Sequence, residues 1–286
     1  MRESFVYPPP SDGKPFRLVM GLRELNPDYW FESGSDVEEQ LLERNRLIEN
    51  LRETVFQVLP GHDSALHQFI AEIVGNLRDH HPEYTVRESL ITHTPTGIAV
   101  DLTKDHPLIQ LGKVLCEDIC LMAKVNGVWT LVAGVVVFPS RWDLREKIGK
   151  DIDSIHTPVP GYGQALAPYM SATFEKIKEG RPVWRRNWSL HSTKDLHQPT
   201  SIHAESKPEN YWWRTERQTL TRLGDGEYLL FTIRNRAEPL EWITKDSESA
   251  AAFADTLESM SDETLEYKSL TKDKEAIVDY LRGRRP

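Results

Sequence analysis

The sequence predicts an α+β fold built on a five-stranded antiparallel sheet, with helices inserted after the second strand. The first two strands come from the segment CLMAKVNGVWTLVAGVVVF (120–138), in which Asn126-Gly127 joins two apolar runs. Asn-Gly between such runs is typical of a two-residue hairpin turn. Three further strand-like runs follow at 183–190, 213–223 and 227–236, and Gly224-Asp225-Gly226 joins the last two.

The helices are predicted from apolar residues at helical spacing. The first begins after Asp36, a plausible N-cap, and Pro60-Gly61 ends it. With the next helix it forms an antiparallel pair behind an irregular, Pro-rich opening that reaches about Trp30. The expected helices are, in chain order, about 36–59, 64–77, 108–119, 143–154 and 162–179, followed by a helical, acidic tail from about 247.

This order predicts three parts. Residues 1–104 form an N-terminal extension with the helical pair, 105–245 form the core, and 246–286 form a C-terminal helical tail. The order of strands and helices in the core is that of a PAS domain, in which helices cover one face of the sheet and a ligand lies between them. A shared fold by itself indicates no function.

Composition excludes several classes of protein. The 286 residues carry a formal net charge of −9, which disfavours binding to nucleic acid or to an anionic membrane. The two cysteines, Cys116 and Cys120, cannot form a disulfide framework and indicate a reducing compartment. No apolar run approaches the length of a membrane span, and the first residues lack a signal-peptide core. We therefore expect a cytoplasmic protein.

Familiar catalytic motifs are absent: the sequence has no Walker loop, no GxGxxG before a helix, no GxSxG and no HExxH. Cys116 and Cys120 could pair on a soft metal, but buried structural thiols are favoured because no third ligand is near in sequence. His191, His197 and His203 recur every six residues, which is not a recurrent zinc-ligand spacing.

His156 stands apart from the other histidines. It ends a helical segment and is followed by Thr157-Pro158-Val159-Pro160, whose two prolines would hold the imidazole in a fixed direction. An axial metal or haem ligand needs such an imidazole. From the residues alone, a structural histidine remains the alternative.

Arginines and tryptophans alternate in the three late strands. Alternate residues of a strand share a face, so Arg186 lies with Trp184 and Trp188. Outward-pointing arginines would be solvated, whereas an inward-pointing one needs an anion, and two propionates would suit it. The arginines concerned are Arg185, Arg186, Arg214, Arg217, Arg222, Arg234 and Arg236.

At these residues the sequence resembles the α-subunit family of haem-dependent oxidative N-demethylases. The combination of FPSRW (138–142), IHTPVPGY (155–162), GRPVWRRNWSL (180–190) and ERQTLTRL (216–223) carries the resemblance. Further matching stretches are MGLRELNPDYW (20–30), HPLIQLGKVLCEDICLM (106–122) and LLFTIRN (229–235).

The resemblance implies a PAS-like domain that binds haem b, an iron cofactor, and acts as a monooxygenase. With dioxygen and electrons, the family converts dimethylamine to methylamine and formaldehyde. This chain has no flavin, nicotinamide or iron–sulfur motif, so a separate reductase component, with flavin or iron–sulfur subunits, would supply the electrons. The implied partners are a small secondary or tertiary methylamine, dioxygen and those subunits.

The resemblance also implies site residues. His156 would be the proximal iron ligand, and the candidates for the haem propionates are Arg141, Arg186, Arg217 and Arg234. Asn187, Glu216 and Gln218 would be the polar side chains on the distal side of the haem. Glu216 or a tryptophan would contact a substrate ammonium.

Two alternatives remain from the sequence. One is a non-catalytic haem-PAS sensor of gas or redox state, although no output module is evident. The other is a haem-free structural subunit that keeps only the scaffold. Turnover of an amine separates the demethylase from the sensor, and haem content separates both from the scaffold.

Overall fold

The computed structural model describes residues 4–201, 206–223 and 226–284. Its main feature is a seven-stranded antiparallel sheet with the order β1-β8-β9-β10-β6-β7-β2. The strands are β1 (Arg23–Glu24), β2 (Phe56–Val58), β6 (Glu117–Val125), β7 (Val128–Val135), β8 (Val183–His191), β9 (Trp212–Leu223) and β10 (Tyr228–Pro239). A separate sheet consists of β3 (Tyr84–Arg87), β4 (Leu90–His93) and β5 (Ile98–Asp101).

The α+β class is confirmed, and β6 to β10 are the five strands that the sequence predicts. The main sheet is larger than predicted because β1 and β2, both from the N-terminal extension, pair with its edge strands β8 and β7. The predicted hairpin turn is confirmed: Asn126 and Gly127 have φ of 50° and 82°, as this turn requires. Gly224 and Asp225 of the second predicted turn lie outside the described residues.

The helices are shorter and more divided than predicted. They are α1 (Val37–Asn50), α2 (Arg52–Val55), α3 (Asp63–His80), α4 (Pro107–Val114), α5 (Leu144–Lys147), α6 (Ile152–His156), α7 (Tyr162–Ala165), α8 (Ala167–Lys176), α9 (Ser247–Glu258), α10 (Asp262–Tyr267) and α11 (Lys274–Leu281). Short 3-10 turns occur at Pro27–Tyr29, Pro208–Asn210 and Leu240–Lys245.

Pairing in the sheet overrides two helical expectations. Residues 56–58 extend along β7 instead of continuing the first helix, and Glu117 to Ile119 begin β6 instead of ending α4. Asp36 precedes α1 but makes no capping hydrogen bond. Its carboxylate instead forms ion pairs with Arg234 at 2.9 Å and Arg236 at 2.7 Å.

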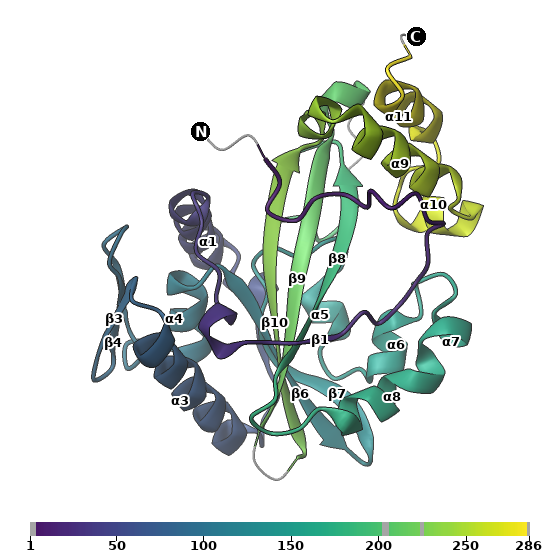
Figure 1. The fold of residues 1–286 in the computed structure, drawn as a ribbon. Coiled ribbons are helices and arrows are strands. Elements are labelled where there is room, and N and C mark those ends of the chain that lie inside the picture. The colour runs from purple at the N-terminus through teal and green to yellow at the C-terminus, as the bar shows by residue number, and fades with distance from the viewer. Residues whose placement is uncertain (1–3, 202–205, 224–225, 285–286) are drawn as a thin grey trace.

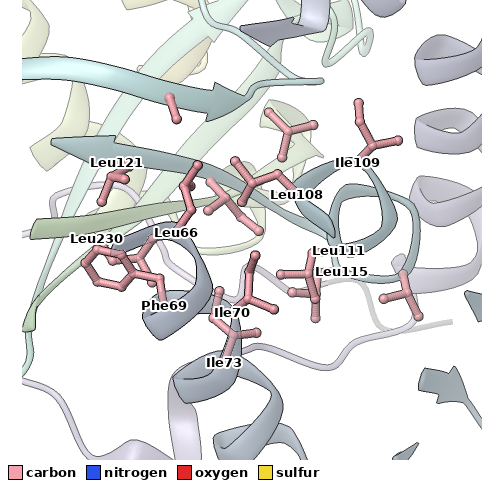
Figure 2. Close-up of a cluster of buried hydrophobic side chains, with 14 of the residues drawn as sticks. Leu66, Phe69, Ile70, Ile73, Leu108, Ile109, Leu111, Leu115, Leu121 and Leu230 are labelled. Carbon is pink, nitrogen blue, oxygen red and sulfur yellow. The ribbon is translucent and has the colours of Figure 1, made fainter. Parts of the chain in front are cut away.

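Helices cover both faces of the sheet (Figure 1). On one, which we call the α3 face, Leu121 and Leu230 pack in one buried cluster with residues of α3 and α4 (Figure 2). On the opposite α6 face, Leu220 and Leu229 pack in a cluster with residues of α6 to α8. The tail helices α9 to α11 close one end of the molecule, where Phe253 packs edge-to-face on Trp188 and Trp213.

Among the described residues, no helix is both long and apolar enough to cross a bilayer.

Candidate functional site

Three predicted site residues meet on the α6 face of neighbouring strands. Asn187 of β8 lies directly opposite Glu216 of β9, so their side chains point to the same face. The Glu216 Oε2 atom accepts hydrogen bonds from Asn187 Nδ2 at 3.3 Å and from Gln218 Nε2 at 2.9 Å. Glu216 is 9% exposed, and its Oε1 atom has no hydrogen-bond partner within the described part of the chain.

Four cations lie near this carboxylate. Burial lowers the pKa of Arg141, Arg185, Arg214 and Lys268, and the negative charge of Glu216 raises each of these pKa values in part. The pKa of Lys268 falls to about 8. No ion pair of 4 Å or less joins Glu216 to any of them within the described ranges. Glu216 is therefore a buried acceptor with one free oxygen in a cationic setting.

Arg141 and Lys268 close the site at the outer edge of β8. The Arg141 guanidinium donates to the carbonyls of Leu190 at 3.0 Å and Lys268 at 2.8 Å. Lys268 Nζ donates to the carbonyl of Trp188 at 2.8 Å and lies over the Trp188 ring. These donors satisfy outward carbonyls of β8 that no neighbouring strand reaches.

His156 has the arrangement of a metal-ligating imidazole. It ends α6, and its Nδ1–H donates to the Ile152 carbonyl at 2.8 Å. A carbonyl can only accept, so the proton lies on Nδ1 and the Nε2 lone pair is free in the neutral ring. Burial lowers the pKa of His156, and the nearby Arg185 lowers it further, so the ring is neutral at pH 7.

Helix α6 places this imidazole on the same side of the sheet as Glu216. Ile152 and Ile155 pack in the cluster that also contains Leu220 and Leu229 of the α6 face. Arg185 of β8 pairs in register with Gln218 and so points to this face as well, and its positive charge acts on both His156 and Glu216. The structure thus brings Asn187, Glu216 and Gln218 into contact, with Arg141 near Glu216, and places His156 on the same side of the sheet.

The other three predicted arginines lie on the α3 face. Arg186 of β8 pairs in register with Arg217 of β9, and Arg217 pairs with Arg234 of β10. The Arg217 guanidinium donates to the Tyr29 and Trp30 carbonyls and forms an ion pair with Glu32 at 3.2 Å. The sheet therefore separates these arginines from His156.

Arg234 is also already paired. Its guanidinium donates to Gln40, to the Asn235 carbonyl at 2.9 Å and to Asp36 at 2.9 Å. Arg217 and Arg234 thus anchor the N-terminal extension to the sheet rather than offering donors to a ligand.

Sequence reasoning did not select Arg185 or Lys268. Arg185 belongs to the arginine-rich run and is the neighbour of Arg186. The two differ only in the face of the sheet to which they point, and that depends on the register of the strand. Lys268 lies 80 residues from Trp188, the residue whose carbonyl it contacts, so no local signal connects it to the site.

The alternative metal sites find no support in the described residues. No three His, Cys, Asp or Glu side chains there are grouped to hold a metal ion. Cys116 and Cys120 are buried free thiols, and burial raises the pKa of Cys116 to about 11. His191 hydrogen-bonds Ser189 and Gln198, and His197 hydrogen-bonds the Val137 carbonyl. His203 lies outside the described ranges.

Comparison with known families decides the membership of the chain. The model of a family described as haem-dependent oxidative N-demethylase, alpha subunit-like, matches residues 21–278. The chain belongs to this family. The description indicates dependence on haem, an oxidative N-demethylase activity for the family, and an alpha subunit that works with other subunits.

The donors of this family member fit a haem. Four ligands of haem iron come from the macrocycle, so the protein has to supply only one or two, and a cluster of three side chains is not required. A neutral imidazole with a free Nε2 atom is such a ligand. Arg185 pairs in register with Gln218 and so points to the face of Glu216, and Arg141 lies near that carboxylate. Both already donate to main-chain carbonyls, Arg185 to Val19 at 3.3 Å and Arg141 to Leu190 and Lys268, but the Nε–H group of each is buried without a partner in the described part of the chain. These two Nε–H groups are donors that could meet two carboxylates.

Proposed function

We propose that the chain is the haem subunit of an enzyme that oxidatively demethylates a small N-methyl amine, converting dimethylamine to methylamine and formaldehyde. One observation carries the proposal: His156, neutral and with Nε2 free, shares the α6 side of the sheet with the buried carboxylate of Glu216. The imidazole of His156 is suited to bind iron, and the carboxylate of Glu216 is suited to bind an ammonium substrate. The family membership of the chain supports the reaction class.

In this proposal His156 Nε2 holds the iron of haem b, and Arg185 and Arg141 face the propionates. Arg185 thereby takes the place of Arg186, Arg217 and Arg234, which lie across the sheet. Bound haem would supply the activation of dioxygen and the oxidation of the methyl group. The overall reaction consumes one dioxygen, two electrons and two protons per amine and releases one water. The electrons come from a reductase subunit, because neither cysteine is accessible and two cannot hold an iron–sulfur cluster.

Glu216 binds the substrate. Dimethylammonium carries one positive charge at neutral pH, and the free Oε1 atom of Glu216 accepts a hydrogen bond from its N–H group. Asn187 and Gln218 hold the other oxygen, Oε2, and so fix the direction in which Oε1 points. Because Glu216 is nearly inaccessible to water, its charge acts strongly on a cation that enters the site. The positive charges near Glu216 would repel that cation, and haem propionates paired with Arg185 and Arg141 would offset part of this repulsion.

The architecture supports a PAS-like core over residues 105–245. The five predicted strands are arranged as β7-β6-β10-β9-β8, and α5 to α8 are inserted after the first hairpin and cover one face. The extension 1–104 contributes both edge strands and the tail 246–286 contributes Lys268, so we propose that both complete the core. The cytoplasmic location remains a prediction.

The test uses the purified full chain reconstituted with hemin. We expect a Soret band that shifts under carbon monoxide, and formaldehyde from dimethylamine when a chemical reductant and dioxygen are supplied. The variant His156→Ala should lose the Soret band, while His67→Ala, a substitution of an exposed histidine of α3, should keep it. No haem binding overturns the proposal, and haem binding without turnover of any N-methyl amine favours the sensor instead.

A further inference from the structure

A second candidate site lies at the outer edge of β8. An open pocket of about 460 Å³ is lined there by residues of β8 and of the N-terminal segment, residues 7–12. Figure 1 shows this segment crossing the strand. Tyr7, Trp184, Trp188 and Trp213 give it aromatic walls. Its volume lies within the range of pockets that bind small organic molecules.

Two arginines of this pocket have no partner of opposite charge. Arg23 lies over the Trp184 ring at 5.7 Å and Arg186 over the Tyr7 ring at 5.0 Å. Neither guanidinium makes a hydrogen bond or an ion pair in the described part of the chain. Burial lowers the pKa of Arg186, and the positive charge of Arg23 lowers it further, so the two groups repel each other.

The pocket is positive within an acidic protein. Its lining contains Arg23, Arg185 and Arg186, and its single carboxylate, Asp12, is paired with Lys14 at 3.3 Å. The whole chain carries a net charge of −9. A local excess of positive charge in a concave surface concentrates anions there. Unpaired guanidinium groups are suited to carboxylate or phosphate because their N–H groups match two oxygens at once.

The pocket adjoins the proposed haem site. Arg186 and Trp184 point to the α3 face, whereas His156 lies over the α6 face. The two sites share Arg185 and Asn187, which line the pocket and point to the α6 face.

We propose that this pocket binds an organic anion in which a carboxylate or phosphate is attached to a flat ring. Arg23 and Arg186 hold the anionic group, and the ring contacts those parts of Trp184 and Trp188 that line the pocket and that Arg217 and Lys268 leave uncovered. The same chemistry could come from the haem itself, through its propionates, or from a separate soluble molecule. The separation of Arg186 from His156 by the sheet favours the separate molecule.

The test is calorimetric titration of the full chain, with and without bound haem, using phenyl phosphate as the probe. We expect binding at one site in both forms, and at least tenfold weaker binding of neutral benzyl alcohol. The double variant Arg23→Gln/Arg186→Gln should weaken the probe at least tenfold. The matched control Arg181→Gln, an exposed arginine just before β8, should bind it normally. Circular dichroism checks that each variant is folded.

Two results would overturn the inference. One is that the parent chain does not bind phenyl phosphate, or that the double variant binds it as tightly as the parent chain does. The other is binding to the haem-free chain that disappears on haem loading, since it would assign both arginines to the cofactor. Neither depends on turnover, so failure of the demethylase proposal would leave this test intact.

Discussion

The imidazole of His156 lies nearly parallel to the ring of Tyr162, with the ring centroids 5.2 Å apart and the planes inclined by 17°. Tyr162 is buried, and its hydroxyl donates to Asp153 Oδ1 at 2.5 Å. The Ile152 carbonyl fixes the Nδ1 side of the imidazole, while Tyr162 fixes the plane. Together they restrict the direction of the free Nε2 lone pair.

Tyr162 is therefore expected to be a positioning residue for His156, the proposed iron ligand. Replacing it by leucine removes the stacked ring, so the variant Tyr162→Leu should bind hemin about tenfold more weakly and show a shifted Soret band. Tyr162→Phe keeps the ring and should retain both the affinity and the spectrum. A titration with hemin, monitored by absorption, measures both the affinity and the position of the Soret band. A Tyr162→Leu variant with parental affinity and spectrum would show that stacking does not orient His156.

The proposed substrate role of Glu216 is tested by Glu216→Gln. This change keeps the shape and the acceptor oxygen but removes the charge that would pair with dimethylammonium. Losing one charge-assisted hydrogen bond of about 1.5–3 kcal/mol should raise the KM for the amine about 10- to 100-fold. Because Glu216 would touch the substrate rather than the iron, the haem spectrum should not change.

The matched control for this experiment is Glu209→Gln, which changes an exposed carboxylate before β9. It should leave the KM unchanged. If Glu216→Gln instead bound less haem than the parent chain, Glu216 would be assigned to cofactor binding.

The sequence predicts the elements that depend on local chemistry. The hairpin at Asn126-Gly127 and the runs of β8, β9 and β10 follow from residues that are adjacent in the chain. His156 could be singled out for the same reason, because the prolines that follow it are its neighbours. The boundary of the first helix was not predictable, since residues 56–58 leave it to pair with β7, a distant strand.

The choice among the arginines depends on distant contacts. Arg185 and Arg186 are adjacent, and a shift of one residue exchanges their faces. Only the packing of α3 on one side and α6 on the other shows which of them shares a face with His156. The pairing of Arg234 with Asp36 likewise joins residues nearly 200 positions apart.

A buried ion pair should make Arg44 essential for stability. Arg44 Nη1 lies 2.8 Å from Asp118 Oδ1, and both side chains are fully inaccessible to solvent. The guanidinium also donates to the carbonyls of Gly112, Cys116 and Glu117, and so ties α1 to α4 and β6. Arg44→Met leaves the Asp118 charge buried without its partner. We expect the free energy of unfolding to fall by about 3–5 kcal/mol.

Urea denaturation measures this loss, and Arg46→Met is the control. Arg46 pairs with Glu43 on the exposed side of the same helix, at 2.6 Å. Its replacement should change the free energy of unfolding by less than about 1 kcal/mol. Similar values for both variants would contradict the structural role of the Arg44–Asp118 pair.

Lys268 should make stability depend on pH in the alkaline range. Burial lowers its pKa from 10.5 to about 8, so between these values the unfolded chain holds a proton that the folded chain has released. The free energy of unfolding therefore gains a contribution as the pH rises from about 8 to 10, by up to about 1.4 kcal/mol per pH unit. Below pH 8 the folded state carries the full cost of the buried charge.

The variant Lys268→Met removes this titration, and it also removes the hydrogen bond to the Trp188 carbonyl. The free energy of unfolding of the parent chain minus that of the variant should rise between pH 8 and 10, as measured by urea denaturation at each pH. For Lys272→Met, a substitution of an exposed lysine in the same tail, this difference should stay constant. Parallel pH profiles for the parent chain and Lys268→Met would mean that Lys268 remains charged throughout this range. Its ammonium would then be held by Glu216 and the Trp188 carbonyl strongly enough to offset its burial.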